Sequence, residues 1–333
     1  MARHSTAVRK IWHGLGLAIV AALVVGALGL LAAMNMRPSL HQWSRLPVRT
    51  GAGDSVELRF LGTAGLVISD GERTLVVDGF VTRPPLWKII SSSVVPDADR
   101  VRAVRAHTGV SRLDAVLVAH SHYDHAMDAP EWVRQAGGQV WGTSSTANIA
   151  LAEGVDAVRI ISPQDRIEVG RFDVRFFQLD HALPERMQGR IAATFTVPAR
   201  VADYKTGGGL GFYFTHGSCR ILAVPSAGRV HADLSQYPAD VIVLSIGQLG
   251  LQNRAYIRDY WQKTVVASGA RLVIPVHWDD FSRSLDRPLK PLPYAVERVD
   301  VAMREIMSLA NDEITVALPV LYEPLDLSAS AGC

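Results

Sequence analysis

The chain of 333 residues contains only two cysteines, Cys219 and Cys333. Two cysteines are too few for the disulfide framework that holds small secreted domains together, so the fold must depend on a hydrophobic core. A single disulfide between Cys219 and Cys333 is the remaining alternative. Hydrophobic residues make up 48% of the sequence, and a chain of this length can form one large domain or two modest ones.

A large excess of charge of one sign is also lacking. The formal net charge is +2, and no dense run of lysine and arginine appears after residue 50. Proteins that bind nucleic acid neutralise its phosphates with such clusters. We therefore expect no nucleic-acid partner.

Charged residues are missing altogether from residues 11–36, and residues 14–34 are almost wholly apolar. A helix that spans a bilayer needs about 20 such residues, so the segment 1–36 predicts one transmembrane helix. A cleaved signal peptide is the alternative. Its apolar region usually covers only about 7–15 residues, and Ala32-Ala33 is a poor cleavage signal.

The orientation and the domain limits follow from the flanking residues. Basic residues lie on both sides of the apolar segment, and the cluster nearer the amino terminus favours a single-pass anchor with its globular domain outside the cytoplasm. Residues 37–54 contain two prolines and two glycines and predict a linker. Residues 55–325 then form the globular domain, and residues 326–333 form a C-terminal tail.

Metal-binding side chains are concentrated in residues 120–125, His-Ser-His-Tyr-Asp-His, which follow an apolar run typical of a buried strand. Residues two apart at the end of a strand point the same way, so His120 and His122 can share one metal. Asp124 and His125 follow where the backbone turns away, so they can bind a second metal. Imidazoles with one carboxylate suit Zn²⁺, and less often Mn²⁺ or Fe²⁺. Two metals about 3.5–4 Å apart form a hydrolytic site.

The order H-x-H-x-D-H resembles the signature of the metallo-β-lactamase fold superfamily. This resemblance implies a four-layer αββα sandwich with two mixed sheets inside, helices outside and metals at one edge. It also implies that His181, after a strand over residues 172–179, completes the first metal site. His277, after a strand over residues 271–276, would complete the second site. The pair His277-Trp278 is similar to the branch that contains ascorbate-phosphate lactonases and phospholipase D-type enzymes acting on N-acyl phosphatidylethanolamine.

Three further residues are candidates for supporting the ligands or contacting a substrate. Asp78 resembles the superfamily's acid below the metal loop and could orient a ligand; a simple turn aspartate is the alternative. Ser226 stands where many superfamily hydrolases have an aspartate that bridges both metals. One branch of true metallo-β-lactamases also has serine there and binds its second metal through Asp, His and His alone. Tyr123, inside the motif, is the third candidate.

Two long irregular segments, residues 80–112 and 182–209, are expected to shape the substrate pocket. In the first, Arg83 and Trp87 could cover the metal site. The apolar residues 86–90 are expected to pack on the domain, and contact with the bilayer is the alternative.

These features predict a binuclear zinc-dependent hydrolase that acts on an ester, a lactone or a phosphodiester in a small molecule or a lipid. The resemblance implies His120, His122 and His181 for one metal, and Asp124, His125 and His277 for the other. Asp124, His120 and His122 are the expected catalytic residues, and Asp124 would orient the nucleophile or shuttle a proton. A β-lactamase and a non-catalytic metal-binding protein on the same fold are the alternatives.

Overall fold

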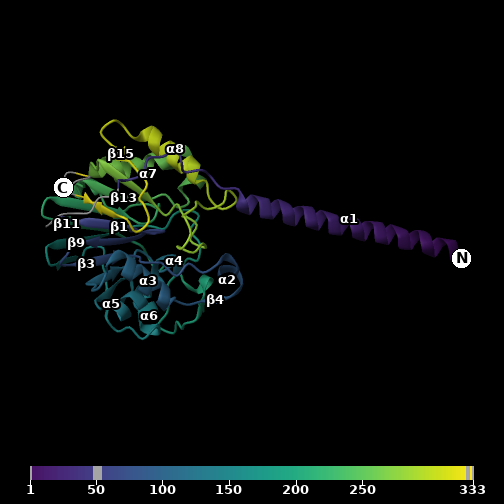
Figure 1. Cartoon of the computed structure of the whole chain (residues 1–333), viewed down its shortest axis with the longest axis horizontal. Coiled ribbons are helices and arrows are strands. Elements are labelled where there is room, and N and C mark those ends of the chain that lie inside the picture. The colour runs from purple at the N-terminus through teal and green to yellow at the C-terminus, as the bar shows by residue number, and fades with distance from the viewer. Residues whose placement is uncertain (1, 48–54, 328–330, 332–333) are drawn as a thin grey trace.

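The structure, a computed structural model, describes residues 2–47, 55–327 and 331. Within these residues the chain forms a rounded body from which one long helix, α1 (Ala2–Asn35), projects (Figure 1). Two seven-stranded mixed sheets lie inside the described part of the body, and helices cover their outer faces. The four-layer αββα sandwich expected from the sequence is therefore confirmed.

Apart from β16, each sheet is built from one continuous block of the sequence. The first sheet contains β1 (Glu57–Gly62), β2 (Gly65–Ser69), β3 (Thr74–Val77), β5 (Ala115–Leu117), β6 (Gln139–Gly142), β7 (Val158–Ile160) and β16 (Pro324–Asp326), in the order β16-β1-β2-β3-β5-β6-β7. The second sheet contains β8 (Arg166–Val169), β9 (Phe172–Gln178), β11 (Leu210–His216), β12 (Cys219–Val224), β13 (Val241–Ser245), β14 (Leu272–Val276) and β15 (Thr315–Val316), in the order β15-β14-β13-β12-β11-β9-β8.

The helices lie outside the sheets. On the side of the first sheet are α3 (Ala98–Thr108), α5 (Ala129–Ala136) and α6 (Ser144–Ala152) (Figure 1). On the side of the second sheet are α7 (Arg254–Trp261), which continues as a π-helical turn over Gln262–Val266, and α8 (Val299–Leu309). The fold also contains two short helices, α2 (Leu86–Ser91) and α4 (Tyr123–Ala126). A small separate sheet pairs β4 (Ser93–Val94) with β10 (Ala199–Arg200).

Strand β3 shows why both faces of the first sheet are apolar. Leu75 and Val77 belong to the core between the sheets, whereas Val76 packs in the second core beneath α3, α5 and α6. Successive side chains of a strand point to opposite faces, so an unbroken apolar run fits a strand covered on both sides. Full burial of one such side chain stabilises the fold by about 1.5–3 kcal/mol.

The segment 80–112 is less irregular than predicted, because it contains the helix α3. Asp97 caps this helix by accepting a hydrogen bond from the Arg100 backbone N–H, and Gly109 ends it in the left-handed conformation. Helix α8 begins at Val299, and just before it the buried carboxylate of Glu297 accepts the backbone N–H of Gln248.

The predicted linker over residues 37–54 is wrong for residues 37–47. Leu40, Trp43 and Leu46 are buried in the core between the sheets. The Leu46 backbone N–H donates to the carbonyl of Leu318, which fixes this stretch beside the last strands. The remaining residues of the predicted linker, 48–54, lie outside the described residues.

The predicted tail over residues 326–333 is also wrong at its start. Asp326 belongs to β16, which pairs with β1, and Leu327 is fully buried. Residues 328–330, 332 and 333 lie outside the described residues. Cys219, at the start of β12, is buried and disulfide-bonded. Its thiol is therefore not free.

Helix α1 meets the requirements for a membrane span by length and composition. Its segment Leu15–Asn35 has a mean hydropathy of 2.7, and none of it is buried within the described structure. A signal sequence near an amino terminus satisfies the same requirements. The apolar side chains exposed along residues 15–31 of this helix are costly in water and favourable in a bilayer.

Candidate metal centre

The predicted ligands lie at one edge of the sandwich because the strands that carry them end there. In the first sheet β3 and β5 are parallel, and in the second sheet β12, β13 and β14 are parallel. Strand β9 is antiparallel to β11, which is antiparallel to β12, so β9 points the same way as β12. The carboxyl ends of these strands therefore bring residues from distant parts of the sequence to one edge.

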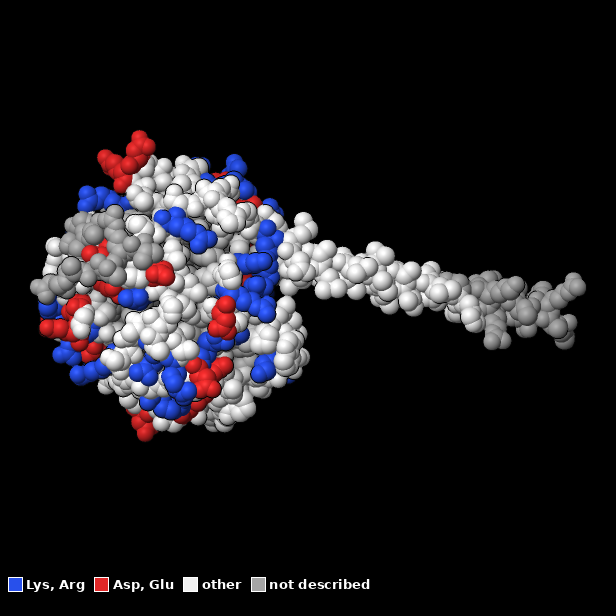
Figure 2. Space-filling view, in the orientation of Figure 1, with Lys and Arg blue, Asp and Glu red and all other residues white. Residues whose placement is uncertain are grey.

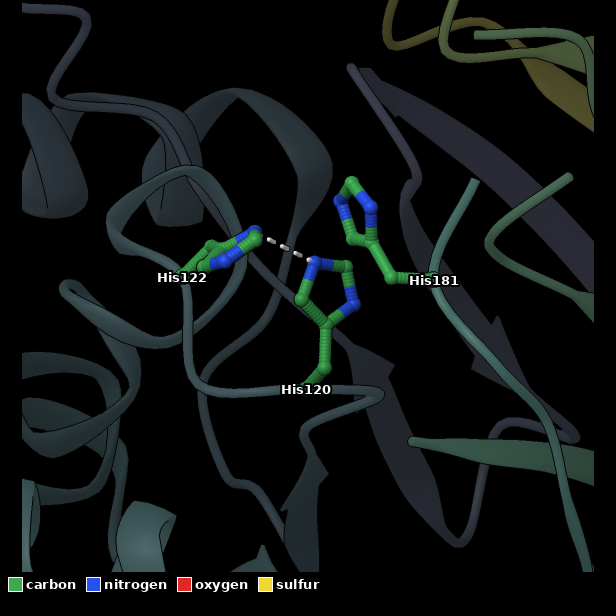
Figure 3. A group of neighbouring side chains, drawn as sticks. All are labelled: His120, His122 and His181. Atoms are coloured by element: carbon green, nitrogen blue, oxygen red, sulfur yellow. Dashed lines mark hydrogen bonds between the residues drawn. The ribbon is translucent and has the colours of Figure 1, made fainter. Parts of the chain in front are cut away.

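The first set of ligands comprises His120, His122 and His181. His120 and His122 are buried in the loop after β5, and His181 follows β9. The three imidazole rings point toward one another (Figure 3), and their ligand atoms all lie within 4.8 Å of one another. His120 Nε2 lies 3.2 Å from His122 Nδ1. His181 Nδ1 is 2.7 Å from the Ala182 carbonyl oxygen, which leaves Nε2 free for a metal.

The second set comprises Asp124 and His125 from α4 and His277 from the end of β14. His125 Nε2 lies 3.2 Å from His277 Nε2. Asp124 Oδ2 lies 3.7 Å from His125 Nε2 and 3.5 Å from His277 Nε2. The structure therefore brings all six predicted ligands together as two groups of three.

Both groups have the separations that a metal requires. Two nitrogens bound to one tetrahedral zinc at 2.0–2.1 Å are about 3.3 Å apart. The two closest nitrogen pairs, one in each group, are 3.2 Å apart. Five imidazoles and one carboxylate are also the ligand types that zinc, iron and manganese accept.

The electrostatic environment keeps most of the donors in their metal-binding forms. Burial lowers the pKa of His122 to about 4, and it also lowers the pKa of His120 well below its usual range. Burial alone would raise the pKa of Asp124, but the imidazoles of His125 and His277 reverse this effect, and the net pKa is lowered. Neutral imidazoles and an ionised carboxylate carry the lone pairs that a metal binds.

Asp78, at the end of β3, holds His125 in position. Its Oδ2 lies 2.7 Å from His125 Nδ1, so the imidazole donates from Nδ1 and directs Nε2 to the metal position. Its Oδ1 accepts the backbone N–H of Ala119, next to His120, at 2.7 Å. One buried carboxylate thus fixes a ligand of the second set and the loop of the first.

We expect Asp78→Ala to weaken binding of the second metal by about 10–100-fold, which is the usual effect of losing a ligand's hydrogen-bond partner. The first metal should stay bound, because its three imidazoles remain. Competition with a chromophoric chelator measures the two affinities. Asp70→Ala is a matched control, because Asp70 pairs with His216 at 3.0 Å away from the metal ligands. Equal metal affinities in both variants would contradict the role of Asp78.

His277 has a strained backbone that its surroundings support. Its φ is 61°, and its backbone N–H donates to the carbonyl of Thr63 at 2.6 Å. A Cβ at Gly247 would lie only 2.8 Å from His277 Nδ1, so the ring needs glycine opposite it. Non-glycine residues at positive φ persist where neighbouring structure holds them, often at functional sites.

Arg83 and Trp87 do not cover the metal site. Arg83 is fully buried and forms an ion pair of 2.6 Å with Asp279, two residues after His277. The other oxygen of Asp279 accepts the backbone N–H of Thr63 at 2.8 Å. The side chain of Trp87 is 62% exposed. The function of Arg83 is therefore to anchor the loop that carries His277.

Ser226 and Tyr123 both border the ligands. Ser226 Oγ accepts the backbone N–H of Ala182 at 3.0 Å and so holds the loop of His181. The ring of Tyr123 packs against Phe80, and its hydroxyl is buried without a hydrogen-bond partner among the described residues.

Ser226→Ala is expected to keep both metals and much of the activity, because a neutral hydroxyl is a poor metal ligand. Loss of its hydrogen bond to Ala182 should cost only about 1 kcal/mol of stability. Ser226→Asp should instead tighten binding of the second metal, if the carboxylate reaches it. Elemental analysis of both variants measures the effect. Loss of one metal from Ser226→Ala would mean that Ser226 is itself a ligand.

The two ligand sets open into a cavity of about 330 Å³. The predicted pocket segments contribute Ile89 from α2, and Arg186, Met187 and Val201 from residues 182–209. The opposite wall was not predicted from the sequence, and its lining residues are Gln248, Leu251, Phe281, Leu292, Val296 and Glu297. Three prolines between residues 288 and 293 were the available signal that this stretch departs from regular structure.

Thr206 also contacts a predicted ligand, although the sequence did not predict it. Its hydroxyl lies 3.3 Å from His122 Nε2 and donates to Glu185 Oε1 at 2.9 Å. Because His122 Nδ1 faces His120, this contact on the other ring nitrogen sets the orientation of the imidazole. A lone threonine in a long loop carries no pattern that could have predicted this contact.

A family model and several curated proteins match the sequence of this chain. A family model described as "Beta-lactamase superfamily domain" matches residues 91–278, which is more than half of the chain. A UPF0173 protein of Pyrococcus furiosus is 26% identical over 147 residues, and this match spans 44% of the chain and 65% of that protein. A UPF0173 metal-dependent hydrolase of Staphylococcus aureus is 20% identical over 234 residues, or 68% of the chain and 87% of that protein. The chain thus matches slightly less than two thirds of the archaeal relative.

Solved structures share the fold at low sequence identity. The metallo hydrolase Igni18 of Ignicoccus hospitalis is 13% identical with a TM-score of 0.51, and the match covers 81% of this chain and 97% of that one. An isothiocyanate hydrolase from Delia radicum gut bacteria is 14% identical with a TM-score of 0.51, and the match covers 81% and 98%. The sequence match and the sandwich agree: the chain belongs to the β-lactamase superfamily and has the metallo-β-lactamase fold.

Proposed function

We propose that this protein is a metal-dependent hydrolase that binds two metal ions at the edge of the sandwich. The observation that carries the proposal is the pair of three-ligand groups, both of which contribute residues to the lining of one cavity. Relatives that carry the name metal-dependent hydrolase support the same reaction class. The complete pair of ligand groups favours a hydrolase over the non-catalytic metal-binding protein, which would not require all six ligands.

The chain's own residues have clear tasks in such a reaction. His120, His122 and His181 would hold one metal, and Asp124, His125 and His277 the other. Two metals supply Lewis-acid activation of water and of the substrate's carbonyl or phosphoryl oxygen. Asp124 would orient the attacking water or shuttle a proton. Asp78 would orient His125 by accepting a hydrogen bond from its Nδ1, which directs Nε2 to the metal position.

Zinc is the proposed metal, and Mn²⁺ or Fe²⁺ would fit the same ligands. The proposed substrate is an ester, a lactone or a phosphodiester. The cavity combines apolar walls from Met187, Leu251 and Phe281 with one cation, Arg186, which suits a substrate with an apolar part and an anionic group.

A hydrolase panel on metal-loaded protein tests the function. The panel should include p-nitrophenyl esters, a lactone, bis-p-nitrophenyl phosphate and the β-lactam nitrocefin, each with and without a chelator. We expect turnover of at least one ester, lactone or phosphodiester that a chelator abolishes and added metal restores. Turnover of nitrocefin alone would favour a β-lactamase, and no turnover by metal-loaded protein would favour the binding protein.

We further propose that α1 anchors the protein in a membrane with the body outside the cytoplasm. The disulfide at Cys219 supports this orientation, because disulfides persist in oxidising compartments and are rare in the cytosol. Digestion of the body by protease added to intact spheroplasts tests the orientation. Protection of the body until the cells are lysed would contradict it.

Deletion of residues 1–35 is expected to move the protein from the membrane fraction to the soluble fraction. The deletion removes the apolar span and leaves residues 37–47 packed on the body. The hydrolytic activity on soluble substrates should survive, because α1 contributes no residue to the lining of the cavity. Full-length protein found wholly in the soluble fraction at its native length would rule out the anchor.

A further inference from the structure

Helix α2 exposes apolar side chains beside the cavity. The structure describes all six of its residues, and none of them is buried. Leu86, Trp87 and Ile90 are 41%, 62% and 68% exposed, while Ile89 lines the cavity. Single exposed apolar residues are ordinary, but a cluster that includes tryptophan marks an interaction surface. The expectation that residues 86–90 pack on the domain is therefore wrong for these three side chains.

The opposite wall of the cavity is fixed to the end of α1. The backbone N–H of Tyr294 donates to the carbonyl of Met36 at 2.9 Å. Arg37 lies 2.7 Å from Asp280 and also donates to the carbonyl of Pro291. This wall supplies Phe281, Leu292 and Val296 to the cavity. The helix that could span a membrane therefore ends against the rim of the cavity.

Helix α2 and the cavity wall at the end of α1 lie on the same side of the body. In Figure 1, α2 and β4 lie on the side of the body from which α1 projects. In the same orientation, Figure 2 shows lysine and arginine side chains gathered along this side, at the base of α1. The wall itself carries exposed Arg287 and Lys290 and the partly exposed aromatic ring of Tyr294. Basic residues beside exposed aromatic and aliphatic residues are the composition of a surface that rests on anionic lipid.

Lys88 gives this surface a further interfacial feature. Its ammonium group lies 5.8 Å over the ring of Trp87. Tryptophan with lysine is typical of the headgroup level of a bilayer, where the indole enters the apolar boundary and the ammonium stays with phosphates.

We propose that Leu86, Trp87, Ile90, Tyr294 and Val296, which we name the membrane-facing patch, dock on the surface of an anionic bilayer. The cavity then opens at the lipid surface, and amphiphilic substrates enter it from the membrane without crossing bulk water. The docking follows from the surface itself, whereas the entry of a lipid substrate rests on the proposed hydrolase function.

Full-length protein in lipid nanodiscs tests the docking without reference to activity. Ile90→Cys carries an environment-sensitive fluorophore, and Met307→Cys carries the same fluorophore as the matched control. Met307 is 43% exposed and lies near the end of α8. Because β15 is parallel to β14, α8 leads the chain back to the edge of the sheet opposite the metal ligands. Labelling is done without reductant, which preserves the disulfide at Cys219.

In nanodiscs of phosphatidylcholine with about a quarter phosphatidylglycerol, the probe at residue 90 should shift to the blue and be quenched by doxyl-labelled lipid. The probe at residue 307 should do neither. In pure phosphatidylcholine the quenching at residue 90 should weaken. Equal behaviour of the two probes would overturn the docking, and full quenching without anionic lipid would overturn the electrostatic part.

A second pair of measurements separates docking from catalysis. Trp87→Ala combined with Ile90→Ser should lower turnover of a membrane-embedded ester several-fold and leave turnover of a soluble ester unchanged. An equal loss on both substrates would show damage to the site and overturn the proposed entry route. Failure of wild-type protein on every substrate would refute the proposed function, while the probe at residue 90 would still decide the docking.

Discussion

His122→Ala is expected to lower kcat/KM by about a thousandfold or more, because a bound metal contributes several kcal/mol of transition-state stabilisation. The substitution removes one of three imidazoles from the first set and leaves His120 and His181 unable to complete it. The fold should persist, because the two sheets and their cores do not depend on this side chain. Initial rates on the substrate found in the panel measure the loss, and circular dichroism monitors the fold.

His41→Ala is the matched control for this variant. His41 is an exposed histidine outside the cavity lining, and its removal should leave kcat/KM unchanged. Excess zinc should not rescue the His122 variant, since the ligand itself is missing. A His122 variant with near wild-type activity would mean that the first set takes no part in the reaction.

Asp279→Ala is expected to lower the free energy of unfolding by about 3–5 kcal/mol, which is the usual cost of leaving one charge of a buried ion pair unpaired. Both side chains of the Arg83–Asp279 pair are fully buried. The substitution also leaves the Thr63 backbone N–H without its acceptor, and the carbonyl of the same residue holds His277. Loss of stability should therefore be accompanied by weaker binding of the second metal.

Chemical denaturation of the variants in detergent measures the change in stability. Asp259→Ala is the control, because its ion pair with Lys263 is exposed and should contribute at most about 1 kcal/mol. Adding Arg83→Met to Asp279→Ala should recover part of the stability, because no unpaired charge then remains buried. A loss no larger than that of the Asp259 variant would contradict the anchoring role of the pair.

The motif over residues 120–125 could be predicted because its ligands are neighbours in the sequence. His181 and His277 are distant, and only the resemblance to a known family assigned them before the structure brought them together. The sandwich was implied by the same resemblance, whereas apolar runs such as residues 74–77 predicted only individual buried strands.

Other parts of the molecule were harder to predict for identifiable reasons. The prolines and glycines of residues 37–54 indicated a linker, and the burial of Leu40, Trp43 and Leu46 in the core between the sheets is not contained in a local pattern. Helix α3 had recognisable caps at Asp97 and Gly109, but the surrounding prolines and serines obscured them. The exposure of α2 depends on which neighbours a short helix lacks, and a local pattern does not contain that information.

The metal content of the purified protein tests the account most directly. Full-length protein prepared without chelator under zinc-replete conditions is analysed for transition metals, together with His122→Ala and His277→Ala. The two three-ligand groups predict about two metals per chain in the wild type and about one in each variant. Fewer than one metal per wild-type chain would contradict the binuclear site on which the proposed function rests.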